Sequence, residues 1–514
     1  MDAVSKPALA FESAFTRRSI IASYFLVIFL ALPLWWKTTS IERQALPVSR
    51  VYAATGRELA FPIHVALDTR NCEVGTDTIV QEVRHHVENN GEFKQNGLSV
   101  EVSSATATAN DYQVVLRPGT RDPIVDGRKV TVEVAPEHAG VAALQLADTL
   151  ATLLTPYTSL RSSQAERVVT YSPRYRLAFT LLNEDAAAGN AALSWDVQNA
   201  LAGTYAAQLS PLLERLSVLH NFTIESQVQY HGPLAFEPRA LQVGEQIEHG
   251  LTPGDLTVFV NSAEWTLSSS VSNDPVLHFV AFIPSSKHSP LRIVDSNGLP
   301  TSSNAFILPQ WGGIIIHNPQ STGIVPTLAG RPLDTIFATF RQQLSALLGV
   351  PELPPHVHAR TRGVAGVTDW QLDALVRRRA AENAASAQDT LQSIVRLVAQ
   401  IEDMPVGEDV KGDVQDALAA LDQAYSTAPS SSTEALTFAS KAQSVASRAF
   451  FNPGMLALLY FPTEHKWAVY APLFASVTAP LLASLIREVL AWKKERKAKA
   501  RGPQPVDSQR PKAE

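Results

Sequence analysis

Two long apolar runs near the ends of the chain most constrain what it can fold into. Residues 19–36 read SIIASYFLVIFLALPLWW and residues 467–486 read WAVYAPLFASVTAPLLASLI, and neither run contains a charged residue. An α-helix rises about 1.5 Å per residue, so each run covers roughly 27–30 Å, close to the hydrocarbon thickness of an endoplasmic reticulum bilayer. We therefore predict one transmembrane helix at 19–36 and another at 467–486.

Each run has an alternative interpretation. The first could be a cleaved signal peptide, but it is longer than the usual apolar core and ends in Trp35, Trp36 and Lys37, where cleavage requires small residues. The second could be a buried core helix. Pro472 and Pro480 disfavour a soluble helix, whereas a membrane helix tolerates proline when its neighbours satisfy the freed carbonyls. The membrane interpretation is favoured for both runs.

Basic residues flank the outer ends of the two runs. Arg17 and Arg18 precede the first, and a tail rich in Lys and Arg follows the second. Because positive flanks prefer the cytosol, we predict a cytosolic N-terminal tail at 1–18, a basic cytosolic tail at 487–514 and a luminal segment at 37–466. The C-terminal tail is interpreted as a topology determinant in preference to a site for anionic lipid.

Composition and one short motif agree with this layout. Asn221-Phe222-Thr223 is an N-glycosylation sequon within the predicted luminal segment, which makes Asn221 a candidate glycosylation site. A net charge of -6 excludes a globally basic nucleic-acid-binding protein. Cys72 is the single cysteine, so neither an intrachain disulfide nor a cysteine-cluster metal site can form.

The luminal segment divides into two parts. Residues 37–350 alternate between β-branched runs and helical stripes, which predicts a mixed α/β domain. We expect strands at 59–67, 98–102, 112–116, 129–134, 167–170, 176–182, 223–230, 256–260, 276–283 and 306–316, and helices at 78–88, 138–154, 195–219 and 333–348. Strand order is left open.

Residues 351–466 are predicted to be helical. Pro351, Pro354 and Pro355 mark a boundary, after which an Ala-rich stretch with Thr368 as its N-cap predicts a helix at 368–402. Further helices are expected at 409–425, 432–450 and 454–460. The fold class is therefore a mixed α/β luminal domain plus a C-terminal helical segment, with one transmembrane helix at each end.

Candidate catalytic residues are few. Cys72 beside Arg70 could be a thiolate nucleophile with His64, His85 or His86 as base, but no spacing makes this specific. A small buried residue or an intermolecular disulfide partner is the favoured interpretation of Cys72.

Metal and phosphate motifs are equally weak. His356 and His358 form a two-ligand fragment without the carboxylate or third histidine that zinc requires, which favours solvated loop residues. No GxSxG, GxxxxGK[ST] or strand-linked GxGxxG motif occurs. Trp311-Gly312-Gly313 indicates a turn or a close backbone approach. We assign no catalytic, cofactor-binding or metal-binding residue.

Two stretches carry a family resemblance. Residues 31–39 (ALPLWWKTT) and 451–482 (FNPGMLALLYFPTEHKWAVYAPLFASVTAPLL), together with the two-span layout, resemble the PIG-S subunit family of the glycosylphosphatidylinositol (GPI) transamidase. The resemblance implies a multi-pass endoplasmic reticulum subunit without catalytic residues of its own. It also implies that other transamidase subunits are partners, among them a caspase-like subunit that carries the chemistry, and it leaves contact with the GPI lipid or the proprotein open.

The second run also suggests how such a subunit contacts its neighbours. Pro472, Ala475, Ala479 and Pro480 suit close packing against another membrane helix. The expected function is a scaffold for GPI-anchor attachment in the lumen. Two alternatives remain from the residues alone: a stand-alone membrane-anchored luminal hydrolase, and a luminal chaperone or carbohydrate-binding module.

Overall fold

The computed structural model describes residues 13–39, 43–70, 76–104, 108, 111–134, 139–157, 167–202, 209–243, 246–267, 272–319, 323–360, 366–401, 404–456 and 463–500. Cys72, both chain ends and residues 457–460 of the expected short helix lie outside these ranges. The chain divides into two compact units. One comprises Met1–Ser49, Leu391–Gln415 and Ser447–Glu514, and the other comprises Arg50–Thr390 and Asp416–Ala446.

A five-stranded sheet forms one half of the larger unit. Its strand order is β13-β14-β11-β6-β8, with β6 to β8, β11 to β6 and β11 to β14 parallel and β13 antiparallel to β14. The strands are β6 (Arg174–Asn183), β8 (Asn221–Gln229), β11 (Val276–Ile283), β13 (Ala305–Leu308) and β14 (Gly312–Ile316). The strands expected at 176–182, 223–230 and 276–283 are confirmed.

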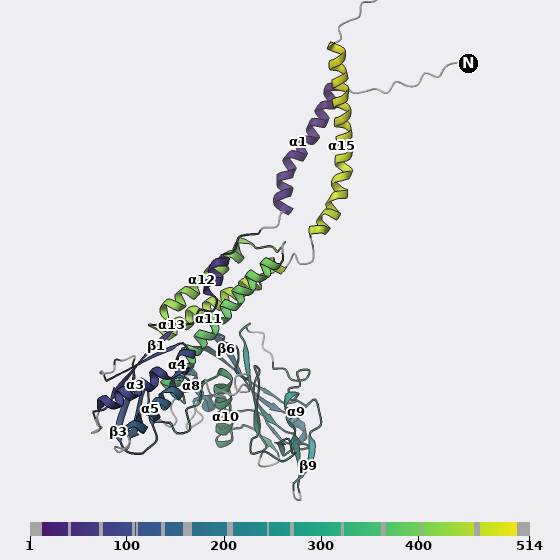
Figure 1. The fold of residues 1–514 in the computed structure, drawn as a ribbon. Helices are drawn as coiled ribbons and strands as arrows, with labels where there is room; N and C mark the ends of the chain where they lie inside the picture. The colour runs from purple at the N-terminus through teal and green to yellow at the C-terminus, as the bar shows by residue number, and fades with distance from the viewer. Residues whose placement is uncertain are drawn as a thin grey trace, which may run out of the picture. The chain divides into compact units, whose positions relative to one another are not determined.

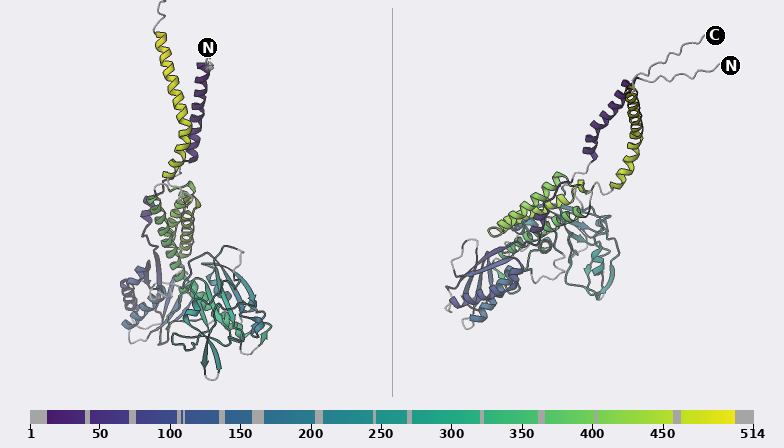
Figure 2. Two further views of the ribbon diagram at one scale, coloured as in Figure 1. Left: turned by 90° about the vertical axis from the view of Figure 1, so that its right-hand side faces the viewer. Right: turned by 45° about the horizontal axis from the view of Figure 1, so that its top comes forward.

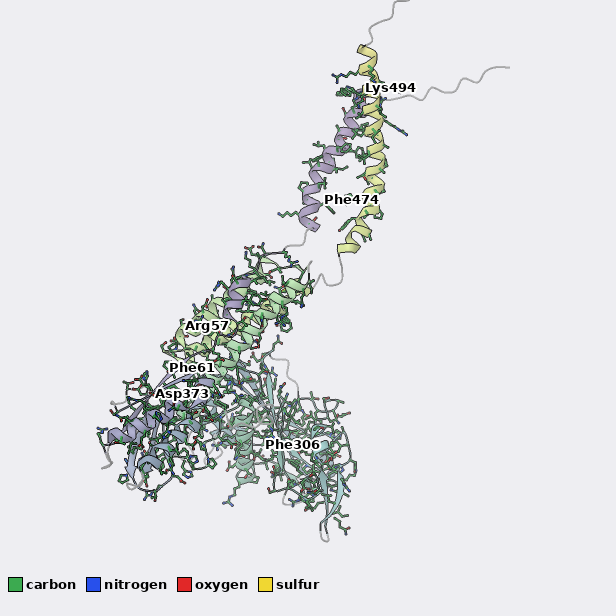
Figure 3. All side chains as sticks on the ribbon, viewed as in Figure 1. Arg57, Phe61, Phe306, Asp373, Phe474 and Lys494 are labelled. Carbon is green, nitrogen blue, oxygen red and sulfur yellow. The ribbon has the colours of Figure 1, made fainter. Side chains whose placement is uncertain are left out.

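Both faces of this sheet are covered. On one face, Phe179 of β6 stacks on Phe279 of β11 and on Phe337 of α10 (Arg331–Leu348), with ring centroids 5.3 Å apart in both pairs. On the other face, Phe282 packs against Phe259 in a second buried cluster, which Phe306 (labelled in Figure 3) borders. Every residue of β6 after the first is buried, as expected for a strand sandwiched between two layers.

A six-stranded sheet forms the other half, with strand order β16-β4-β5-β3-β1-β2. The strands are β1 (Phe61–Asp68), β2 (Leu98–Ser103), β3 (Tyr112–Pro118), β4 (Ile124–Asp126), β5 (Lys129–Val134) and β16 (His358–Ala359). The helices α3 (Thr76–Asn89) and α5 (Ala139–Leu154) lie together on one side of it (Figure 1). The first half of β1 alternates between buried and exposed residues, which is the pattern of a strand with one covered face.

Four expectations for the larger unit are wrong. Residues 256–260 are not a strand, because Thr252 and Asp255 form a capping box that begins a helix, α9 (Pro253–Thr257). Residues 306–316 form two strands, since Gln310 adopts a φ of 60° in the intervening turn. Residues 167–170 join no ladder. The helix expected at 195–219 is α7 (Val197–Ala202) and α8 (Leu209–Leu216), and the Ser210 hydroxyl reaches Leu201 O at 2.8 Å, which a continuous helix would not allow.

Three long helices follow the sheets: α11 (Asp369–Gln400), α12 (Glu408–Thr427) and α13 (Ser432–Phe450). The expected N-cap is confirmed, because Thr368 Oγ1 accepts from the Gln371 N–H and the Gln371 side chain accepts from the Thr368 N–H. The remaining elements are α2 (Val48–Ala54), α4 (Gly91–Gln95), η1 (Ala186–Ala188), β7 (Ala191–Ala192), β9 (Arg239–Val243), β10 (Gln246–Leu251), β12 (Leu291–Ile293), β15 (Ile324–Val325) and α14 (Pro453–Leu456).

Candidate functional site

The smaller unit contains two helices that are long and apolar enough to cross a membrane. They are α1 (Ala14–Thr39), with a candidate span at Phe15–Trp35, and α15 (Thr463–Ala500), with a candidate span at Ala468–Lys494. None of either span is buried within the chain. Apolar side chains exposed along the whole length of a helix require either a bilayer or a partner to cover them.

The two helices pair in antiparallel fashion, and the views of Figures 1 and 2 agree that they lie side by side. At one end, Glu488 of α15 accepts from Arg17 Nε at 2.7 Å and from Arg18 Nε at 3.3 Å. At the other end, the Trp35 ring lies 5.2 Å from Phe474 and 5.8 Å from Tyr470. The basic flank of the first span is therefore level with the start of the basic tail.

The pairing divides α15 into two faces. Tyr470, Leu481 and Glu488 are partly buried and fall on one side of the helix, the side that meets α1. A helix turns by about 100° per residue, so Ala479 lies about 180° from Tyr470 around the axis and Pro472 about 200°. Both are exposed.

The other two predicted packing residues are exposed as well. Ala475 falls on the face opposite α1, about 140° from Tyr470, whereas Pro480 falls on its flank, about 80° away. Three of the four predicted packing residues thus share one surface directed away from α1.

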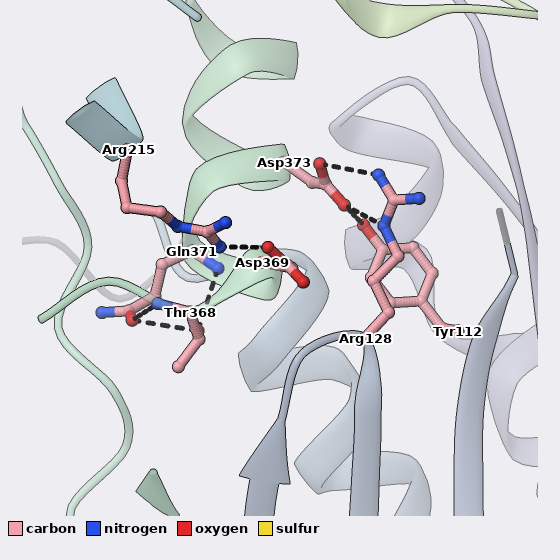
Figure 4. A network of polar contacts seen from close by, with 7 residues as sticks. All are labelled: Tyr112, Arg128, Arg215, Thr368, Asp369, Gln371 and Asp373. Atoms are coloured by element: carbon pink, nitrogen blue, oxygen red, sulfur yellow. Dashed lines mark hydrogen bonds and ion pairs between the residues drawn. The ribbon is translucent and has the colours of Figure 1, made fainter. Parts of the chain in front are cut away.

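A polar network in the larger unit links the start of α11 to the six-stranded sheet and to α8 (Figure 4). Asp373 accepts from Tyr112 Oη of β3 at 2.7 Å and from Arg128 Nε, beside β5, at 2.9 Å. One turn earlier on the same helix, Asp369 pairs with Arg215 of α8. The N-terminal turns of α11 are thereby held to the six-stranded sheet and to α8.

The network is built around a buried phenol. Tyr112 is 5% exposed and packs against the ring of Trp370 at 4.3 Å. Burial raises the pKa of Tyr112 to about 12, so its hydroxyl stays protonated. The hydroxyl donates to Asp373 and accepts from Arg377 Nη1 at 3.0 Å. This arrangement links α11 to β3 through the Tyr112 hydroxyl.

Comparison with known proteins identifies the family. The model of the phosphatidylinositol-glycan biosynthesis class S protein family matches residues 22–495. The GPI-anchor transamidase component PIGS of Bos taurus is 29% identical over 564 residues, which cover 97% of this chain and 100% of the bovine protein. This chain belongs to the PIG-S family. The GPI transamidase component PIG-S homolog of Schizosaccharomyces pombe is 31% identical, with 94% of this chain and 85% of the relative covered.

A more distant relative is also similar over most of its length. The GPI transamidase component GPI17 of Saccharomyces cerevisiae is 25% identical and covers 88% of this chain and 88% of its own length. The family match begins at residue 22, within the first candidate span, and ends at residue 495, just after the second, so the PIG-S similarity covers most of the first span, all of the second and all of the chain between them. The resemblance seen in residues 31–39 and 451–482 is confirmed.

Asn221 is the first residue of β8, which is the edge strand of the five-stranded sheet. It is exposed, as is Thr223, the other residue that defines the sequon. A sequon on an exposed strand end is accessible to modification, so the fold of this PIG-S family member is compatible with a glycan there.

The structure describes most of the other residues that the sequence singled out. Among the residues described, no group of three or more His, Cys, Asp or Glu could hold a metal ion. His358 lies in β16 with its Nε2 3.2 Å from Asp122, and His64 lies 3.4 Å from Glu101. Cys72 lies outside the described residues. Gly312 confirms the close backbone approach, because a Cβ there would lie 1.9 Å from His278 O.

Sequence reasoning missed one polar cluster as well as the network around Tyr112. His288 lies between two carboxylates, with Nδ1 2.5 Å from Glu184 and Nε2 3.1 Å from Glu237. Glu184 also accepts from the Ser285 N–H at 2.8 Å. Glu184 and His288 are 104 residues apart, and neither belongs to a motif that could have revealed the pair.

Proposed function

We propose that this chain is a membrane subunit of the GPI transamidase, the complex of which its relatives are named components. One observation carries the proposal: the family match runs from residue 22, within the first candidate span, to residue 495, beyond the second, and includes the sheets between them. Relatives from cattle and two yeasts are each named as a component of this transamidase. A stand-alone hydrolase and a chaperone or carbohydrate-binding module, the two alternatives, find no support in the comparisons.

Within that complex we assign this chain a scaffolding role in attaching GPI anchors to proteins in the endoplasmic reticulum lumen. The chemistry belongs to the caspase-like subunit that the family resemblance implies. The polar groups that the fold brings together support this division, since Asp369, Asp373 and Glu184 are all occupied in joining one structural element to another. Their role is to fix the body that partners recognise.

The proposed topology has two spans, both chain ends in the cytosol and the bulk of the chain in the lumen. It assigns residues 1–18 and 487–514 to the cytosol, 19–36 and 467–486 to the membrane, 37–350 to a luminal α/β domain and 351–466 to a luminal helical segment. The antiparallel pairing of α1 and α15 supports it, because Arg17 and Arg18 meet Glu488 just beyond the second apolar run.

The face of α15 directed away from α1 is the proposed contact with a membrane helix of another subunit. Pro472, Ala475 and Ala479 lie on this face and expose little side-chain bulk, so a neighbouring helix backbone can approach closely. Pro480 on the flank removes a backbone donor and favours a local bend. Contact with the GPI lipid or the proprotein through the luminal body remains part of the proposal.

The membrane contact is tested by purifying the full chain from membranes in mild detergent and identifying the co-eluting subunits. Ala479→Leu combined with Pro472→Leu enlarges the outward face, and we expect recovery of the partner subunits to fall severalfold. Ser484→Leu is the matched control, because Ser484 is exposed and lies about 140° around the helix from Ala479 and about 180° from Ala475. Unchanged co-purification of the double variant would contradict the proposed contact.

The topology is tested with sealed microsomes and a glycosidase. We expect added protease to trim the chain ends and spare the bulk, and Asn221→Gln to abolish a glycosidase-sensitive mobility shift. Thr223→Ser keeps the sequon and should keep the shift. Digestion of the bulk in sealed microsomes would show that the orientation is reversed.

A further inference from the structure

A polar pocket lies beside the Tyr112 network, in the larger unit. It has a volume of about 310 Å³ and is lined by β1, by the start of β3, by α11 and by the turn that precedes α13. Phe61 and Asp373, both labelled in Figure 3, are among its lining residues. The pocket therefore joins four parts of the chain that are far apart in sequence, residues 61–64, 111–128, 373–377 and 428–433.

Arg377 of α11 lines the pocket and has an unused hydrogen-bonding group. The residue is 8% exposed, and its Nη2 has no hydrogen-bond partner among the described residues. No described carboxylate lies within ion-pairing distance of its guanidinium, whose Nη1 donates to the neutral Tyr112 hydroxyl. A buried cation that lacks a counter-ion is costly, so an anionic ligand would satisfy both its charge and its free donor.

The first turn of α13 supplies further donors to the same pocket. This 19-residue helix begins at Ser432, and its first residues, Ser432 and Thr433, line the pocket together with Ser430 and Ser431. Ser431 serves as the cap, accepting from the Glu434 N–H at 3.2 Å. The N–H groups of a helix's first turn precede the first intrahelical acceptor and carry the positive end of the helix dipole.

The two carboxylates that line the pocket are already occupied. Asp373 holds Arg128 and Tyr112, as described above. Asp111 accepts from both the N–H and the hydroxyl of Thr108 at 2.7 Å, and these bonds lower the pKa of Asp111. Arg377 is therefore the lining charge that remains uncompensated.

We propose that this pocket binds a phosphate group, held by the Arg377 guanidinium, the first-turn N–H groups of α13 and the hydroxyls of Ser432 and Thr433. A tetrahedral phosphate offers several acceptor oxygens to donors that converge from different directions, which a planar carboxylate does less well. The phosphate can belong to a lipid headgroup or be free in solution, because both present the same oxygens.

A second pocket competes for the same arginine. It has a volume of about 580 Å³ and is lined by Arg377, Arg378 and Tyr157, but also by Glu58, Glu382 and Asp389. Arg378 is paired there with Glu382 at 2.6 Å. The three carboxylates repel anions, so this larger pocket is the poorer anion site. Arg378 lines the larger pocket but not the smaller one, and its substitution therefore provides a matched control.

The test is thermal unfolding of the detergent-solubilised full chain, titrated with inorganic phosphate against chloride at equal ionic strength. We expect a saturable rise in Tm with phosphate. Arg377→Gln should weaken the apparent affinity roughly tenfold or more, since a charge-assisted bond is lost. Ser432→Glu should do the same while leaving the Arg377–Tyr112 bond intact, and an acidic residue in a first helical turn does not impair folding. Arg378→Gln should bind as the wild type does.

Each outcome is decisive. Identical phosphate and chloride curves, or a phosphate effect that survives Arg377→Gln, would overturn the proposal. An equal loss in Arg378→Gln would also overturn it by placing the anion in the larger pocket. Glycerophosphoethanolamine in place of phosphate separates the sources: binding supports a headgroup ligand, and its absence while phosphate binds supports a free ion. Because binding is measured on the chain alone, failure here leaves the subunit assignment intact.

Discussion

The two largest sheets of the larger unit differ in how their faces are covered. In the five-stranded sheet, β6 is buried along nearly its whole length, between α10 on one face and the cluster around Phe259 and Phe282 on the other. In the six-stranded sheet, the first half of β1 and all of β5 alternate between more and less exposed residues. The first is stabilised by apolar packing on two faces, the second by packing on one face together with polar contacts to α11.

This difference predicts which substitutions should destabilise each sheet most. A strand enclosed on both sides has no room to relax when a side chain is removed, whereas a strand beside an open pocket can admit water. Conversely, the polar network around Asp373 belongs to the six-stranded sheet, so charge substitutions should affect that half more.

The largest expected effect is that of Phe179→Ala. This ring contacts Phe279, Phe337 and Phe340, so its removal should lower the free energy of unfolding by about 3–5 kcal/mol. Phe61→Ala, at the start of β1 and beside the polar pocket, should cost less because water can fill the space. Urea unfolding of the purified chain measures both, and equal losses would remove the distinction between the two sheets.

Asp373→Ala should have the next largest effect. It leaves the buried Tyr112 hydroxyl without its acceptor and Arg128 without its counter-ion, which should cost about 1–3 kcal/mol. Asp126→Ala is the control, because Asp126 pairs with Arg360 at 3.3 Å with both side chains more than half exposed, and such pairs contribute about 0–1 kcal/mol. If the two variants unfold alike, the Asp373 network does not hold the six-stranded sheet.

The smallest effect on the free energy of unfolding at neutral pH is expected from the protonation of His220, which precedes β8 of the five-stranded sheet. Its Nδ1 lies 2.6 Å from Ser172 O, and burial lowers its pKa from 6.5 to about 4. The unfolded chain therefore binds more protons than the folded chain between these two pH values. Stability is full above pH 6.5 and should fall as the pH drops towards about 4, by up to about 1.4 kcal/mol per pH unit.

The variant His220→Asn isolates this contribution. It should flatten the dependence of the urea midpoint on pH between 6.5 and 4. A slope identical to that of the wild type would mean that His220 is not the group responsible.

Much of the fold was predictable because local pattern and burial agree. Strands such as 276–283 are β-branched and aromatic runs, and the helical stripe at 333–348 matches α10 within two residues. The failures occur where a local signal overrides hydrophobicity. Leu256 and Val258 look like part of a strand, but the capping box at Thr252 begins a helix there. Val168 and Val169 are apolar, yet Val169 N–H bonds to Leu347 O at the end of α10 and joins no sheet.

The candidate site was predictable only in part. Apolar runs and flanking charges predict two spans, and the antiparallel pair agrees with the charge pattern. The sequence does not show which face of α15 contacts α1, because that face is identified only by the contacts of Trp35 and Glu488 in the structure. Asp373 and Tyr112 are 261 residues apart, and Arg377 and Tyr112 are 265 apart. No short-range spacing encodes such contacts, so neither the network nor the pocket beside it could be found before the fold was known.

The pairing of α1 with α15 has a consequence for how the intervening chain can evolve. Because the two helices are paired, the end of α1 at residue 39 and the start of α15 at residue 463 are held near each other. The chain between them therefore forms one closed loop. The entropy of closing a loop changes by only about 0.6 kcal/mol when its length doubles. Insertions between the two spans therefore leave the closure almost unaffected, in keeping with an alignment to the bovine relative that extends over 564 positions.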